Sequence, residues 1–180
     1  MALSAATDRR KQLTTDTLII PVAASETMYP GGLVCSDADG YAVSGADTAN
    51  YEMEGIAVHQ TDADGNRVLT EDNKIDNSSG SDGDVYVLVR RTGRFRFDTA
   101  ETVDQSAMSA QAYISDDDTV ACDADSVTND IECGRVARVV NSGTVEIEIE
   151  EAVEATGRSY SAPSTTTTTA AATTTTTSAT

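Results

Sequence analysis

The 180-residue sequence lacks tryptophan and has little of several other residue types: two phenylalanines, two lysines, one histidine and three cysteines. It contains no stretch of 18 consecutive apolar residues, so it predicts no transmembrane helix. The near absence of Trp and Phe argues against a glycosidase, because enzymes of that kind bind sugars on aromatic surfaces. The first 13 residues include basic side chains but no apolar segment after them, and no secretory signal peptide is expected.

The three cysteines are Cys35, Cys122 and Cys133, an odd number with wide spacing and no C-x-x-C pair. This pattern favours small buried side chains over a zinc site or a disulfide scaffold. At most one bridge within the chain can form. Its candidates are Cys122 and Cys133, which lie near the ends of two neighbouring predicted strands.

The sequence contains none of the motifs that mark nucleotide-binding loops, serine nucleophiles or zinc proteases. His59 stands at the end of an apolar segment, with no Ser or Cys motif around it. A lone histidine is more often a packing or surface residue than a general base. The sequence therefore predicts a protein that is not an enzyme, with no catalytic residues, no cofactor and no metal.

Acidic residues dominate the charge: 30 Asp and Glu against 12 Lys and Arg give a net charge of -18 and an isoelectric point near 4.1. Binding to nucleic acid or to an anionic membrane requires clustered Lys and Arg, so neither is an expected partner. An acidic, lysine-poor surface repels itself at low salt, and counterions relieve that repulsion. The composition thus favours a protein adapted to a high-salt medium, whose stability should increase with salt.

Composition divides the chain into three parts. Residues 163–180 are Thr and Ala with a few Ser and one Pro, carry no charge and have nothing with which to build a core. This tail is interpreted as a disordered end, a glycosylated stalk or an extended strap along a neighbour. We expect an N-terminal arm over residues 1–17, a β-rich domain over 18–162 and the tail over 163–180.

Apolar residues alternate with polar ones in most of the central part, as strands of a half-buried sheet require. In the segment from Thr144 to Glu150, three β-branched residues face one way and three glutamates the other. Arg94 and Arg96 alternate with the two phenylalanines in the same manner. If the arginine and glutamate faces are neighbours, cross-strand pairs add a few tenths of a kcal/mol each. A second strong strand is expected at 84–91, and weaker strands are expected at 18–22, 33–35, 41–43, 55–59, 112–114, 119–122 and 134–140.

Turn residues separate these segments and predict an all-β fold, either a small β-barrel or a β-sandwich. One short helical turn is expected within 104–111, and two hairpins are predicted, over Asp116–Asp118 and over 141–143.

Two Asp-Ala-Asp-Gly runs begin at Asp37 and Asp62. They present oxygen ligands of the kind that calcium prefers, but they lack the glycine and glutamate spacing of an EF-hand loop. Tight turns select the same residues, and turns are the favoured interpretation.

The order of these segments resembles the head decoration, or capsid cement, proteins of tailed bacterial and archaeal viruses. A glycine-led strand ends in Tyr41-Ala-Val, a Gly55-Ile-Ala-Val strand follows, and Gly83-Asp-Val leads into Gly93-Arg-Phe-Arg-Phe. A hairpin at Ala112-Tyr-Ile-Ser-Asp-Asp and an alternating last strand complete the likeness, which covers residues 18–150. The acidic charge and the Thr/Ala tail depart from the family pattern.

The resemblance implies a non-enzymatic structural protein that binds the outer surface of an assembled major capsid protein lattice, on the virion, as a homo-oligomer, with a trimer favoured. The cationic cluster Arg9, Arg10 and Lys11 is the candidate capsid contact. The alternative function is a secreted or cell-surface adhesion module on a Thr-rich, O-glycosylated stalk. A carbohydrate- or calcium-binding module is a further alternative, which would need a concave aromatic or carboxylate site.

Overall fold

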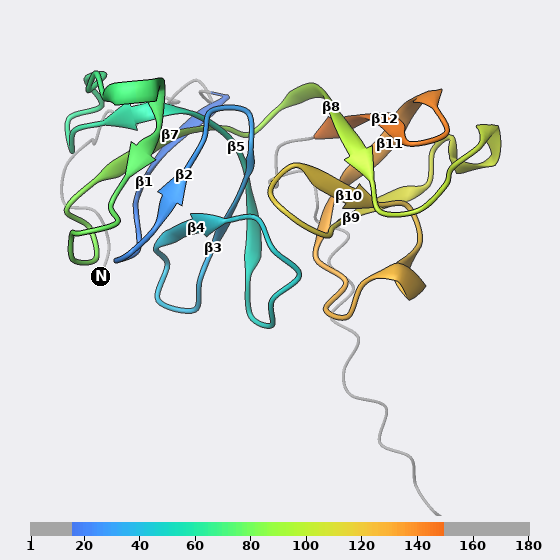
Figure 1. Cartoon of the computed structure of the whole chain (residues 1–180), viewed down its shortest axis with the longest axis horizontal. Coiled ribbons are helices and arrows are strands. Elements are labelled where there is room, and N and C mark those ends of the chain that lie inside the picture. The colour runs from blue at the N-terminus through green and yellow to red at the C-terminus, as the bar shows by residue number, and fades with distance from the viewer. Residues whose placement is uncertain (1–15, 150–180) are drawn as a thin grey trace, which may run out of the picture.

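The computed structural model describes residues 16–149, and these residues form almost only β-structure (Figure 1). The all-β prediction is therefore confirmed. The strands are β1 (Thr17–Pro21), β2 (Thr27–Met28), β3 (Leu33–Ser36), β4 (Ala42–Ser44), β5 (Glu52–Thr61), β6 (Ile75–Asp76), β7 (Tyr86–Arg90), β8 (Gly93–Thr99), β9 (Gln111–Ile114), β10 (Thr119–Ala121), β11 (Glu132–Asn141) and β12 (Thr144–Ile149). Short 3₁₀ helices are η1 (Glu71–Asn73), η2 (Gln105–Ala107) and η3 (Ala124–Ser126).

Residues 93–149 form a closed five-stranded barrel in the order β10-β8-β12-β11-β9, which we call the barrel lobe. All pairs are antiparallel except β8 with β10, which is parallel. The strict alternation of β12 suits a barrel strand that has one face inside and one face outside. Val145 and Ile147 are fully buried inside the barrel, while the glutamates between them face outward. Both expected hairpins are confirmed: Ile114 pairs with Val120, and Val139 pairs with Val145.

Residues 16–90 form the first lobe, a five-stranded sheet in the order β1-β7-β5-β3-β4. An isolated parallel bridge between Val22 and Ala42 connects the two edges of this sheet just beyond β1. The sheet therefore curls around a core of its own, which the two-stranded sheet of β2 and β6 helps to enclose. This core consists of Ile20, Val22, Met28, Val34, Ala42, Ala57, Ile75, Val87 and Val89.

The two lobes share the second hydrophobic core, since the barrel interior continues onto the outer face of the first lobe's sheet. Leu33 and Cys35 on β3 pack into that shared core, whereas Val34 between them points into the core of the first lobe. Strand β3 is thus buried on both faces, which explains why its first three residues, Leu33 to Cys35, are all apolar rather than alternating. The sequence left both a small barrel and a sandwich open. The fold contains a small closed barrel, and a curled sheet packs against it.

Several details differ from the sequence prediction. Strands β2 and β6 were not expected, because two residues are too few to show a period. The helical turn within 104–111 is the single 3₁₀ turn η2, where the Asp104 carboxylate accepts a hydrogen bond from the Ser106 N–H at 2.8 Å. All three cysteines are free thiols, and Cys35 and Cys133 are buried, as the favoured interpretation expects; the alternative Cys122–Cys133 bridge is not formed.

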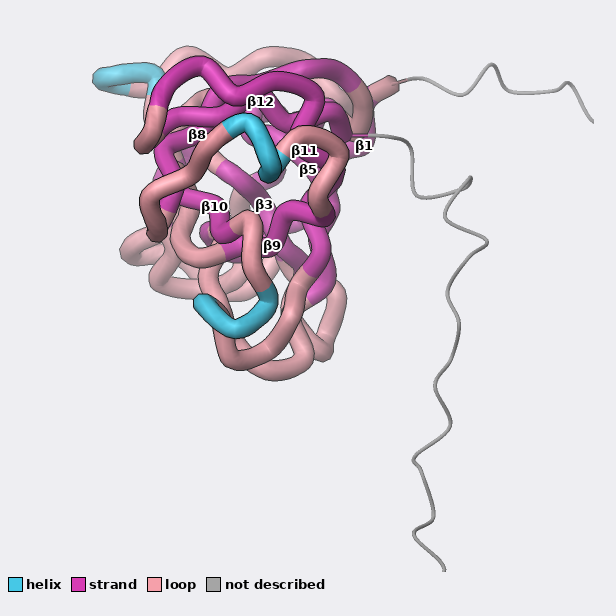
Figure 2. The backbone as a smooth tube through the Cα atoms, turned by 90° about the vertical axis from the view of Figure 1, so that its right-hand side faces the viewer, coloured by secondary structure: helices cyan, strands magenta, loops and turns pink. Residues whose placement is uncertain are grey.

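The two ends of the described chain lie together at the connection between β7 and β8. The Arg91 N–H donates to the Asp16 carbonyl at 2.8 Å, and Ile149 pairs with Gly93. Asp16 and Ile149 are therefore close in space although they are at opposite ends of the domain, on one side of the molecule in Figure 2. Anything that precedes residue 16 or follows residue 149 starts from this one corner.

Candidate interaction surface

The outer face of β8, β12 and β11 carries a ladder of arginines and glutamates. Strands β8 and β12 are neighbours, so the condition for the expected cross-strand pairs is met: Arg94 pairs across the strands with Glu148, and Arg96 with Glu146. Arg94 Nε and Nη2 each lie 3.1 Å from Glu148 Oε1. On the other side of β12, Arg138 Nη2 lies 2.9 Å from Glu146 Oε2. These are exposed cross-strand pairs, so each contributes little to stability.

Four cations face three carboxylates on the described part of this ladder: Glu146 and Glu148 on β12, and Asp98 on β8, which accepts from the Thr144 hydroxyl at 3.3 Å. Arg135, whose register partner is Glu148, donates to the Ser109 carbonyl at 3.4 Å. We call Arg94, Arg96, Arg135 and Arg138 the arginine face. Arg96 is 63% exposed and its Nε lies 3.8 Å from Glu146 Oε2, which is too far for a hydrogen bond. Its guanidinium therefore retains donors that a partner can use.

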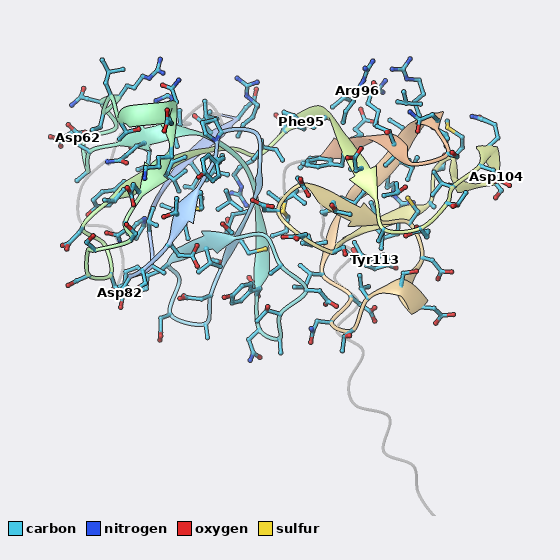
Figure 3. All side chains as sticks on the ribbon, viewed as in Figure 1. Asp62, Asp82, Phe95, Arg96, Asp104 and Tyr113 are labelled. Carbon is cyan, nitrogen blue, oxygen red and sulfur yellow. The ribbon has the colours of Figure 1, made fainter. Side chains whose placement is uncertain are left out.

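Charge is segregated over the rest of the described domain. Residues 16–149 contain eight cationic and 26 acidic side chains, and four of the eight cations form the arginine face. Acidic side chains gather instead on the β3–β4 turn and the β10–β11 connection. We call Asp37, Asp39, Asp123, Asp125 and Asp130 of these two segments, together with Asp47 on the β4–β5 connection, the acidic rim. Figures 1 and 3 show these two segments on the side of the molecule opposite Arg96.

The Asp-Ala-Asp-Gly runs are turns, as predicted. Asp37 Oδ1 accepts from the N–H groups of Asp39 and Tyr41 at 3.0 and 2.9 Å, and Asp62 Oδ1 accepts from those of Asp64 and Asn66 at 3.0 and 2.8 Å. The first aspartate of each run thus satisfies the backbone of its own turn. Within residues 16–149, no three His, Cys, Asp or Glu side chains are arranged to hold a metal ion.

A groove of about 480 Å³ lies on the surface between the two lobes, beside the arginine face. Tyr29, Gly31 and Gly32 line it from the first lobe, and Arg96, Phe97, Asp98, Asp117, Asp118 and Thr144 line it from the barrel. Burial, together with the neighbouring Asp116 and Asp118, raises the pKa of Asp117 above its ordinary value. The Asp117 carbonyl also accepts from the Leu33 N–H at 2.7 Å, so this hairpin helps to join the lobes.

Potential nucleophiles and bases are poorly placed for chemistry in the described part. Burial raises the pKa of Cys35 and of Cys122 to about 11, so both thiols are protonated at neutral pH. Burial and the neighbouring Arg67 lower the pKa of His59, whose register partner on β7 is Leu88. His59 has no serine or cysteine opposite it. That the protein is not an enzyme stays a prediction.

The predicted capsid contact Arg9, Arg10 and Lys11 lies outside the described residues, as does the Thr/Ala tail. The structure adds where the arm begins, beside Arg91 and the arginine face. No helix of residues 16–149 is both long and apolar enough to cross a membrane. Comparisons with protein family models, with curated proteins and with solved structures found no match to this chain.

Sequence reasoning missed Asp47, which joins the two lobes on the acidic rim. Its carboxylate accepts hydrogen bonds from the backbone N–H groups of Thr128 and Asn129 at 2.6 and 2.8 Å, and from the Asn129 amide at 3.0 Å. Slight burial acts to raise its pKa, but these hydrogen bonds outweigh that effect and hold the pKa below its ordinary value. The partners are more than 80 residues away, so no local pattern could identify them.

Replacing Asp47 by alanine is expected to lower the free energy of unfolding by about 1 kcal/mol at neutral pH, since it removes charged hydrogen bonds between the lobes. Because the folded-state pKa is lowered, this stabilisation is present above the unfolded-state pKa and is lost as pH falls through the folded-state value. Urea unfolding of both proteins at neutral pH and at about pH 2 tests this, with a smaller difference expected in acid. Asp64→Ala, at an exposed aspartate in the turn that Asp62 begins, is the control; an equal loss there contradicts the prediction.

Proposed function

We propose that this protein is a non-enzymatic structural protein that binds the outer surface of an assembled viral capsid and stabilises it. The order of sequence segments motivates the proposal, and one structural observation supports it most: both ends of the described domain meet at the β7–β8 connection. Flanking segments that leave from one corner can extend over the same underlying surface. In this proposal both segments contact neighbouring capsid subunits from that corner and tie them together.

Stabilisation by such a protein follows from mass action. It binds the assembled lattice in preference to loose subunits, so every bound copy shifts the equilibrium toward the shell. A homo-oligomer, with a trimer favoured, repeats each weak contact and multiplies its effect. In this proposal Arg9, Arg10 and Lys11 of the arm contact an acidic area of the major capsid protein, and neither nucleic acid, membrane, cofactor nor metal takes part.

The test is attachment to purified particles stripped of the protein. Deleting residues 1–15 is expected to reduce occupancy on the particles while the melting temperature stays unchanged, because β1 begins at Thr17. Neutralising only Arg9, Arg10 and Lys11 to glutamine should reproduce most of the loss. Truncation after Ala162 serves as the control for removing an uncharged end. Full occupancy by the arm deletion would contradict the role given to the arm, and failure of the intact protein to bind particles would contradict the function.

The Thr-rich tail favours a second candidate, an adhesion module carried on an O-glycosylated stalk. Residues 165–177 contain ten threonines and three alanines, which is the composition of such stalks. Mass spectrometry of the protein from its natural source separates the two functions. A copy number tied to the capsid lattice supports decoration, whereas glycan on the threonines of a cell-associated protein supports the stalk.

A further inference from the structure

We propose that the arginine face binds the acidic rim of a second copy of this chain, in a head-to-tail contact. The proposal concerns self-association alone and does not depend on capsid binding. It starts from an excess of cations on the ladder: four arginines face three carboxylates, Glu146, Glu148 and Asp98. The side chains of Arg94, Arg96 and Arg138 are 53–63% exposed. Glu146, only 20% exposed, serves both Arg96 and Arg138, which limits what each can gain from it.

The kind of cation matters as well as its number. The face contains arginine and no lysine, and a guanidinium presents a planar fork of donors that matches a carboxylate. Arginine is also enriched at protein interfaces, whereas lysine is depleted there. Arg96 makes its only described ion pair at 3.8 Å, so its fork can accept a carboxylate without giving up a hydrogen bond.

Charge complementarity identifies the occupant. A domain with 26 acidic side chains repels other acidic surfaces over most of its area, and the arginine face is the place where such a surface can approach. The acidic rim of another copy has the required chemistry. Asp39 and Asp125 on that rim are exposed, in a turn and in η3, and the ordered hydrogen bonds of those segments use Asp37 and Asp123 instead.

The contact must be between copies, because the two surfaces lie on opposite sides of one molecule (Figures 1 and 3). An interface between two different patches is heterologous, and it closes into a ring when the rotation between copies permits and otherwise continues as a chain. Rigid strands carry the arginines, so the face is presented without a cost in loop ordering.

The experiment is sedimentation equilibrium of the full chain and two charge-reversed variants at low salt. Arg96→Glu with Arg138→Glu is expected to weaken self-association about tenfold or more, because two attractive contacts become repulsive. Asp39→Arg with Asp125→Arg should weaken it to a similar extent. That second result separates the proposal from a net-charge effect, since reducing the overall negative charge would by itself strengthen association.

Mixing the two variants should restore association, because the reversed face of one matches the reversed rim of the other. This rescue also shows that both proteins are folded. The control is Arg67→Glu with Lys74→Glu, which makes the same change in charge at two cations of the first lobe, away from the arginine face. It should leave association unchanged. A wild-type protein that is monomeric up to about 1 mM, or a mixture that associates no better than its components, overturns the proposal.

Discussion

Replacing Gly55 by alanine is expected to destabilise the protein by about 3 kcal/mol or more, one of the two largest effects that the structure predicts. Gly55 is buried in β5 with a φ of 146°, a conformation that L-residues rarely adopt. An added Cβ would also overlap the carbonyl oxygen of Arg90 on β7. Neither the strain nor the clash can be relieved without separating two paired strands.

Thermal unfolding measures this effect, with a fall in melting temperature of about 10 °C expected for a domain of this size. Gly143→Ala is the matched control, because it lies in a β-turn where the nearest atom to a new Cβ, Asn141 Oδ1, is 3.9 Å away. The control should change the melting temperature little. Equal stability of the two variants would show that the backbone at Gly55 is not constrained as described.

Leu33→Ala is expected to cost about 2–5 kcal/mol, because its side chain is 1% exposed and fills the core shared by the two lobes. Although Leu33 belongs to the first lobe, its removal should destabilise the barrel equally. Chemical denaturation should therefore show one transition, shifted as a whole, whether it is followed by circular dichroism or by native-state hydrogen exchange in β12.

The control is Leu69→Ala, which changes the same residue type at a position that is 80% exposed and should alter stability by less than about 0.5 kcal/mol. Two separate transitions in Leu33→Ala, with only the first shifted, would mean that the lobes unfold independently. The shared core would then be a contact between domains rather than one cooperative unit.

The fold shows how the charges of this protein are distributed over its surface, which the net charge does not. The net charge of -18 argues against nucleic acid as a partner, and it also hides a local excess of arginine on the barrel. Of the cations in the described domain, Arg94, Arg96, Arg135 and Arg138 stand on two strands that are separated by more than 30 residues but flank the same strand β12. Composition alone describes an acidic surface, whereas the structure describes a polarised one.

Strand positions were predictable where the alternation is long or the turn chemistry is clear. β12, β8 and the hairpin over Asp116–Asp118 follow from period two and from turn residues, both of which are local properties. The polar faces that carry Arg94 and Glu148 were also predicted, but that the two strands are neighbours was only a condition in the sequence analysis and is decided by the fold. Strands β2 and β6 were missed because their short pairing depends on a neighbour almost 50 residues away.

Local sequence patterns were enough to predict the fold class, the acidic and uncharged parts of the chain, and the faces that β8 and β12 bury. Only the tertiary structure decided that the barrel closes through the parallel pair of β8 and β10, that β3 is buried on both faces, and that Asp16 and Ile149 meet at one corner. The difference lies in how far apart along the chain the interacting residues are. Side-chain alternation and turn conformation depend on adjacent residues, whereas strand order, shared cores and the grouping of charges depend on contacts between residues that are far apart in the chain.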